Sequence, residues 1–129
     1  MKFRRTSMII CLSILILTLL SGCNLRINWR GTSSANHMDY QYTTYSGSQQ
    51  KNFSMQDGQS ILLDYAAEVN KGFLILRIND PDNITILERS MFDDESDHVE
   101  FTVEKSGLYT LLIIGEETGG GFTVNWQIK

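Results

Sequence analysis

The most constraining feature of this sequence is a period-two alternation of apolar and polar residues near its C-terminus. Phe122, Val124, Trp126 and Ile128 alternate with Thr, Asn and Gln. Successive side chains of a β-strand point to opposite faces, so this pattern predicts a strand with one buried and one solvated face. The segment 99–103 alternates in the same way and predicts a second strand of this kind.

Nearly continuous apolar runs at 73–78 and 108–114 predict central strands that are covered on much of both faces. Further strands are predicted at 40–45, 51–55, 60–69 and 84–91, of which 60–69 would also tolerate a helical turn. Clusters of Gly, Asn, Asp and Ser separate these strands, and the predicted turns lie at 46–48, 56–58, 70–72, 80–83, 105–107 and 119–121. About seven or eight short strands therefore predict an all-β fold, a single small antiparallel β-sandwich.

The N-terminus has the pattern of a secretory signal peptide. Lys2, Arg4 and Arg5 precede 13 mostly apolar residues at 8–20. A 13-residue helix spans about 20 Å, which is shorter than a hydrocarbon core of about 30 Å. A cleaved leader is therefore predicted, and an uncleaved signal anchor over 7–25 is the alternative.

The segment after the apolar run, Leu20-Ser21-Gly22-Cys23, resembles the bacterial lipobox at all four of its positions. The resemblance implies a diacylglyceryl group on the Cys23 sulfur and cleavage between Gly22 and Cys23. It also implies a cell-envelope protein that is lipid-anchored to a membrane, with its domain outside the cytoplasm. Because two acyl chains hold a protein far better than one, the anchor would be stable.

The predicted domain organisation is a signal peptide at 1–22, a lipidated Cys and tether at 23–38, and the sandwich at 39–129. Arg26, Trp29 and Arg30 of this tether would rest at the headgroup level, where Trp and Arg are favoured. The alternative is that 25–29 form a short first strand. His37 is predicted to be a surface residue.

Composition excludes several classes of protein. One Pro, two Cys and 42% hydrophobic residues exclude a disordered chain and a disulfide scaffold. Without the three basic residues of the leader, eight Lys and Arg face 15 Asp and Glu, which leaves a net charge of −7. A domain with this charge does not bind nucleic acid. Cys11 leaves with the leader and the Cys23 sulfur is modified, so thiol catalysis and thiolate metal sites are excluded.

Two segments of the predicted sandwich resemble known domain families. The stretch from Gly72 to Pro81 reads GFLILRINDP, and the stretch 100–111 reads EFTVEKSGLYTL. Together they resemble the Golgi-dynamics-type (GOLD) sandwich and the pre-peptidase C-terminal domain of secreted bacterial proteins. Gly107-Leu108-Tyr109 also resembles the tyrosine corner of immunoglobulin-like sandwiches. These resemblances imply a sandwich that contacts another molecule and does not catalyse a reaction.

The acidic segment 93–98 is the strongest candidate for a functional site in the sequence. Calcium needs six to eight oxygen ligands, and Asp93, Asp94 and Asp97 would supply some of them. The spacing does not match an EF-hand loop. The pattern therefore predicts a solvated loop, with calcium at these three residues as the alternative. The glycines at 119–121 predict a hairpin turn, because the Lys and the helix of a phosphate-binding loop do not follow them.

Tyr40 and Tyr42 share one strand face by parity, and Tyr45 lies on the other. Core or edge packing is the simpler role for them, and a platform for sugars is the alternative. The two histidines are far apart in the sequence and the mature chain has no free thiol, so few side chains are candidates for catalysis. No enzymatic activity is therefore predicted, and no cofactor beyond the lipid on Cys23. We expect an anchored, non-catalytic module that binds or assists another envelope protein. The alternative is a small carbohydrate- or cell-wall-binding module that uses exposed Tyr, with or without calcium.

Overall fold

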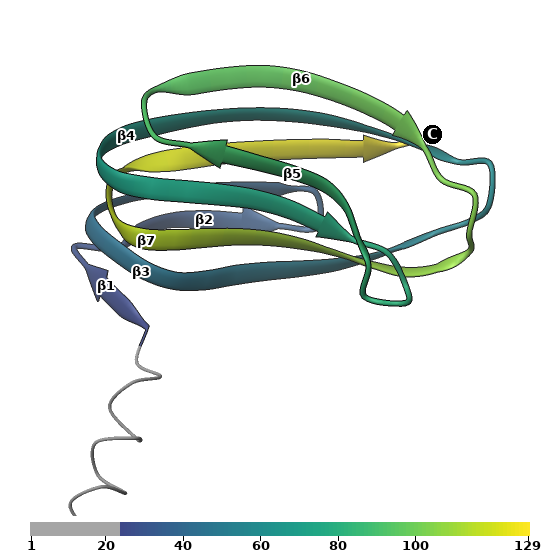
Figure 1. Ribbon diagram of the computed structural model, residues 1–129, viewed down its shortest axis with the longest axis horizontal. Helices are drawn as coiled ribbons and strands as arrows, with labels where there is room; N and C mark the ends of the chain where they lie inside the picture. The colour runs from purple at the N-terminus through teal and green to yellow at the C-terminus, as the bar shows by residue number, and fades with distance from the viewer. Residues whose placement is uncertain (1–23) are drawn as a thin grey trace, which may run out of the picture.

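The structure is a computed structural model that describes residues 24–129, and every regular element of this part of the chain is a β-strand (Figure 1). The predicted all-β class is therefore confirmed. All strand pairs are antiparallel, as predicted. The strands are β1 (Leu25–Ile27), β2 (Arg30–Ser34), β3 (His37–Met55), β4 (Ser60–Asn79), β5 (Thr85–Met91), β6 (Glu95–Thr102) and β7 (Gly107–Ile128).

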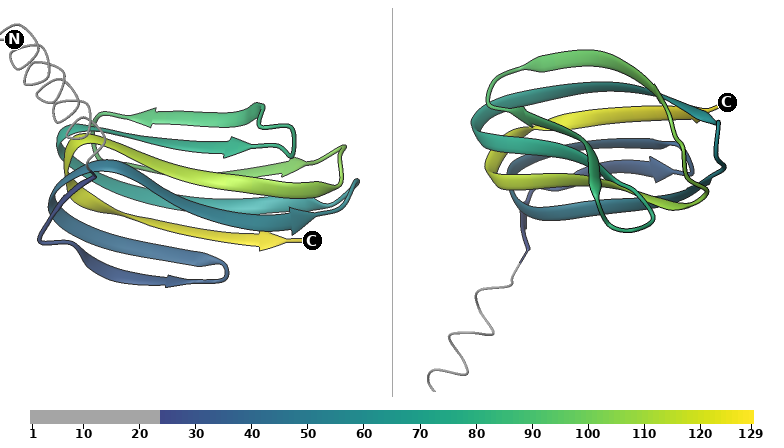
Figure 2. Two further views of the ribbon diagram at one scale, coloured as in Figure 1. Left: turned by 90° about the horizontal axis from the view of Figure 1, so that it is seen from below. Right: turned by 45° about the vertical axis from the view of Figure 1, so that its right-hand side comes forward.

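Three long strands, β3, β4 and β7, build both layers of the sandwich, because each of them bends near its middle (Figures 1 and 2). β7 pairs with β3 on one side and with β4 on the other. The first halves of β3 and β4 pair with β2 and β6, which gives the layer β2-β3-β7-β4-β6. β1 pairs with residues 44–46 at the bend of β3, and β5 pairs with the second half of β4, which gives the layer β1-β3-β7-β4-β5. We call these the β2/β6 layer and the β1/β5 layer.

The bends explain why three predicted turns are absent. The segments 46–48, 70–72 and 119–121 were predicted as turns, but they lie inside β3, β4 and β7. At the bend the backbones approach closely: a Cβ on Gly72 would lie 2.2 Å from the Glu116 carbonyl oxygen, and one on Gly120 would lie 2.1 Å from that of Glu68. Both glycines have positive φ, 60° and 124°. Glycine therefore serves to bend continuous strands here, and the hairpin predicted at 119–121 is wrong.

The N-terminal segment belongs to the sheet. Of the two alternatives for 25–29, the structure has the short strand, β1, which pairs with residues 44–46 of β3. β2 then pairs with residues 37–41 of β3. Met38 is fully buried. The ordered sandwich thus starts at Leu25 rather than at residue 39, and 24–38 is not a free tether.

The core lies between the two layers and follows the alternation of the strands. Leu63 and Leu76 of β4 and Leu111 of β7 have no more than 1% exposure. The predicted tyrosine corner is present: Tyr109 is buried, and its hydroxyl donates a 2.7 Å hydrogen bond to the Lys105 carbonyl oxygen. The predicted turn at 80–83 is present as well, and the Asp80 carboxylate caps it by accepting hydrogen bonds from the backbone N–H of Asp82 and of Ile84, each at 2.9 Å.

Candidate functional site

The outer surface of the β2/β6 layer, which we call the polar face, carries polar side chains that are aligned across all of its strands. Its central row crosses five strands. Cross-strand register pairs Ser34 with His37, His37 with Asn125, Asn125 with Asp64, and Asp64 with His98. Side chains at paired positions point to the same face of a sheet. The two histidines of the sequence therefore lie on one row, three strand spacings or about 15 Å apart.

Hydrogen bonds within this row hold its side chains in place. His37 Nδ1 donates to the Asn125 Oδ1 atom over 2.5 Å. His98 Nδ1 forms an ion pair with the Asp64 carboxylate. The hydrogen bond to Asp64 and the negative charge of that residue raise the pKa of His98 above its ordinary value. The imidazolium form of His98 is thus favoured at the end of the row.

This pKa shift gives a direct prediction. Because Asp64 is its main cause, Asp64→Asn should lower the pKa of His98 towards the value of a free imidazole. The His98 ring protons, followed by NMR through a pH titration, report this pKa. Asp39→Asn is the matched control, since Asp39 lies on the same layer but next to Thr123, and it should leave the His98 pKa unchanged. The same midpoint in wild type and Asp64→Asn would show that the two side chains are not paired in solution.

Three connected hollows run along the polar face. One of those centred on the row has a volume of about 420 Å³ and is lined by Asp64, Ala66, His98 and Asn125 among others. A second hollow, of about 490 Å³, shares Asp64, His98 and Asn125 with it. A smaller one, of about 110 Å³, continues from Ala66 towards Gly121. Because alanine and glycine occupy the middle of the face, small side chains leave a shallow groove there.

The tyrosines do not form the exposed platform that the sequence allowed. Tyr42 and Tyr45 are 6% and 0% exposed, and Tyr40 is half-buried. Register shifts on both sides of Tyr45 bring it to the inner side together with Tyr42, so the parity prediction fails at this point. Burial raises the pKa of Tyr42, and it raises that of Tyr45 to about 12. The simpler prediction, core packing, holds for Tyr42 and Tyr45.

Trp29 closes the side of the sandwich between β1 and β2. Its ring stacks on Tyr40 at 4.5 Å and on Tyr42 at 5.5 Å, and the Arg26 guanidinium lies 4.5 Å from its centre. Trp29 and Arg26 therefore pack against the domain, although they were predicted to rest on lipid headgroups. Arg30 is exposed and donates a hydrogen bond to the Gln41 side chain at 3.3 Å.

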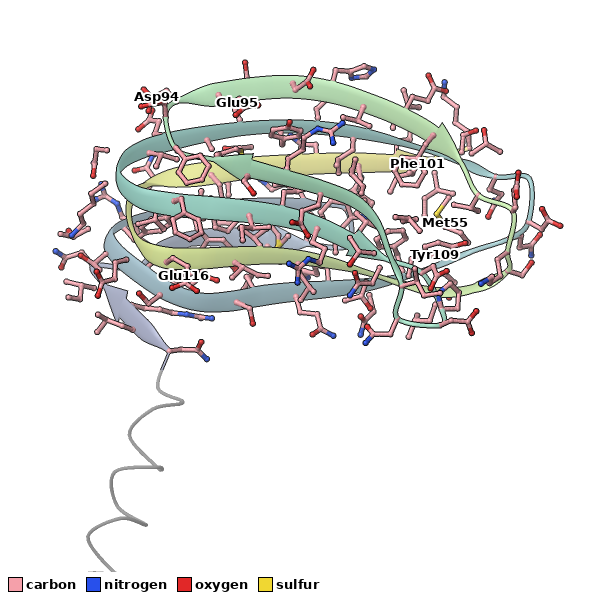
Figure 3. The ribbon with its side chains drawn as sticks, viewed as in Figure 1. Met55, Asp94, Glu95, Phe101, Tyr109 and Glu116 are labelled. Carbon is pink, nitrogen blue, oxygen red and sulfur yellow. The ribbon has the colours of Figure 1, made fainter. Side chains whose placement is uncertain are left out.

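The acidic segment has structural roles of its own. Asp94 accepts a 2.9 Å hydrogen bond from the Val69 backbone N–H, and Asp97 accepts one of 2.7 Å from the His98 backbone N–H. Figure 3 shows Asp94 where the chain passes from β5 to β6, at the bent end of the domain. Within residues 24–129, no three His, Cys, Asp or Glu side chains gather as a metal site. Calcium at Asp93, Asp94 and Asp97 stays a prediction of the sequence.

The lipid-attachment residue Cys23, the cleavage site at Gly22 and the leader lie outside the described residues. From residue 24 onward, the chain has no helix with the length and apolarity to cross a membrane.

Comparisons with known proteins reach only the level of the fold. No protein-family model matches the chain, and no curated protein sequence matches it. A solved structure titled "CBM4 structure and function" has a TM-score of 0.49 at 8% identity, over 80% of this chain and 78% of the other. The pre-peptidase C-terminal domain of a Bacillus anthracis collagenase has a TM-score of 0.48 at 12% identity, over 73% and 89%.

A carbohydrate-binding module of Cellvibrio mixtus lichenase 5A, solved with cellotriose, has a TM-score of 0.44 at 13% identity, over 82% of this chain and 86% of that one. The collagenase domain belongs to one of the two families that segments 72–81 and 100–111 resemble. All of these scores are below 0.5, so the comparisons do not bear on what the chain binds.

Proposed function

We propose that the protein is a non-catalytic, lipid-anchored envelope module that binds a glycan on its polar face. The observation that carries this proposal is the row Ser34–His37–Asn125–Asp64–His98 beside a groove floored by small residues. Sugar hydroxyls both donate and accept hydrogen bonds, and this row offers an amide, a carboxylate, imidazoles and a hydroxyl side by side. These side chains project from paired strands, which position them more rigidly than loops would.

The chemistry of the face favours a glycan over a protein partner. The centres of protein interfaces are rich in aromatic and apolar anchors and poor in charged residues. The middle of the polar face instead consists of Ala66, Gly121, Thr123 and Asn125. Recognition would rest on hydrogen bonds rather than on ring stacking, because Tyr42 and Tyr45 are buried.

Anchoring rests on the sequence. The basic start, the apolar segment 8–20 and the four matching lipobox residues support a lipid on Cys23. A domain held this way would present its groove to the polymers of the cell envelope. A protein partner stays a prediction of the sequence.

Affinity electrophoresis tests the glycan proposal. We expect the protein to be retarded in gels that contain at least one of three soluble probes: laminarin, hydroxyethyl cellulose or glycol chitosan. Asn125→Ala should raise the dissociation constant derived from this retardation about tenfold, because it removes one well-placed amide at the centre of the row. Asn52→Ala is the matched control, since Asn52 is an exposed strand residue on β3 outside the polar face, and it should bind as wild type does.

Two results would contradict the proposal. One is the absence of retardation by all three probes. The other is equal retardation of Asn125→Ala and Asn52→Ala, which would move the glycan away from the polar face.

A further inference from the structure

The outer surface of the β1/β5 layer carries an apolar strip along its two central strands, β4 and β7, and polar side chains of β3 border this strip. On β4 and β7, the buried residues Leu74, Leu76, Leu111 and Ile113 point inward. Their neighbours must point outward because strand side chains alternate. The apolar residues among these outward neighbours are Phe73, Ile75, Leu108, Leu112 and Ile114, which we call the apolar face; Arg77 and Thr110 point outward beside them. Leu108 is 53% exposed, and the other four are half-buried by their neighbours.

The apolar face is nearly free of net charge. Arg77 and Glu88 lie on it and pair with each other at 2.8 Å, so their charges cancel. Lys71 and Glu116 stand at its border, at the bend, where Figure 3 places Glu116. The polar face, in contrast, carries Asp39, Asp64, Glu68 and Glu100 on its strands, against the cationic side chains of Arg30 and His98. The domain therefore has one polar side with an excess of carboxylates and one side with an apolar strip and little net charge.

The apolar face continues to the N-terminal end of the described chain. Leu25 and Ile27 of β1 are 46% and 43% exposed, and they point away from the core because Arg26 between them packs on Trp29. Leu25 and Phe73 line one hollow of about 610 Å³, whose charged lining residues are Lys71, Glu116 and Glu117. Phe73 in turn contacts Phe92, which is 63% exposed, with ring centres 5.3 Å apart.

Little chain separates this surface from the anchor. Cys23 precedes Leu25 by two residues, which span less than about 10 Å even when extended. With β1 already part of the sheet, the domain has no tether that would let it stand away from the membrane. Once the anchor is inserted, weak contacts of the domain with the bilayer become intramolecular, so they need little intrinsic affinity.

From these observations we propose that the apolar face rests on the lipid bilayer and that the polar face points away from it. This inference rests on the lipid anchoring in the proposed function. The side chains of Leu25, Ile27, Phe73 and Phe92 would enter the headgroup region first, because they lie nearest to the anchor. Since the apolar face is neutral and the opposite face is acidic, the contact should not depend on anionic lipid.

Fluorescence at two matched positions tests this orientation in the full, lipidated chain. Leu112→Cys on the apolar face and Thr123→Cys on the polar face each receive an NBD label, since the native Cys23 sulfur is blocked by lipid. The proteins are reconstituted in phosphatidylcholine vesicles, with and without 30% phosphatidylglycerol. We expect a blue-shifted emission and quenching by doxyl-labelled lipid at 112, neither effect at 123, and no difference between the two lipid mixtures.

Three results would overturn the inference. Equal, water-like emission at both positions in vesicle-bound protein would mean that the domain stands free of the bilayer. A blue shift at 112 without quenching by the labelled lipid would mean that a second copy or another protein covers the apolar face. Protein that does not float with the vesicles at all would overturn the anchoring itself.

Discussion

Gly120→Ala should destabilise the protein by about 3 kcal/mol or more, a large part of the 5–15 kcal/mol that typically stabilises a domain. Gly120 lies in the bend of β7 with φ 124°, a region that residues with a Cβ adopt only at a cost of about 1–3 kcal/mol. In addition, the new methyl group would lie 2.1 Å from the Glu68 carbonyl oxygen. Relieving this contact requires β4 and β7 to move apart, which adds about 1–3 kcal/mol.

Gly58→Ala is the matched control for this prediction. Gly58 also has positive φ, 88°, but a Cβ there meets nothing within 4 Å. The loss of stability in Gly58→Ala should therefore come from the backbone conformation alone and amount to about 1–2 kcal/mol. Urea unfolding followed by the fluorescence of Trp29 and Trp126 measures both variants. Equal losses would show that the close approach of the strands at the bend contributes nothing, contrary to the geometry.

Cys23→Ser should abolish lipid attachment altogether and leave the leader uncut by the lipoprotein signal peptidase. A hydroxyl at this position is a far weaker nucleophile than a thiolate, so the diacylglyceryl transfer cannot proceed. Incorporation of labelled palmitate and the electrophoretic mobility of the chain report the two steps. The protein should then fractionate as an uncleaved precursor instead of the mature lipoprotein.

Cys11→Ser provides the control within the same leader. Cys11 lies in the apolar segment 8–20 and outside the lipobox, so its replacement should leave lipidation and cleavage intact. Complete processing of the wild type in the presence of globomycin would contradict the lipoprotein prediction, because that inhibitor blocks the peptidase concerned.

The sequence predicted which side chains of the candidate site point outward, but not that they lie side by side. Alternation correctly places Thr123 and Asn125 on the outer side of β7, since the buried Val124 between them points inward. No local signal, however, indicates that His37 and His98 share a row with Asn125. Their alignment depends on the registers of three strand pairs whose members are distant in sequence, and a shift by one residue in any of them would break the row.

The aromatic residues show a second limit of the same kind. Parity assigns Tyr40 and Tyr42 to one side of β3 and Tyr45 to the other. The structure brings Tyr45 inward, with its hydroxyl donating to the Ile113 carbonyl oxygen at 2.8 Å. Two register shifts in the bend of β3 cause this, and they exist because three strands bend together there.

The sequence by itself determined the class of fold, the alternating segments that form β3 to β7, most of their inner and outer faces, the turn at 80–83 and the tyrosine corner at Tyr109, because these depend on residues close together in the chain. Only the tertiary structure decided that predicted turns are bends in continuous strands, that β1 and β2 complete the sandwich, and that its two outer faces differ in polarity. The physical reason is that a bend and a register are set by contacts between distant segments, and each such contact is too weak to leave a local pattern.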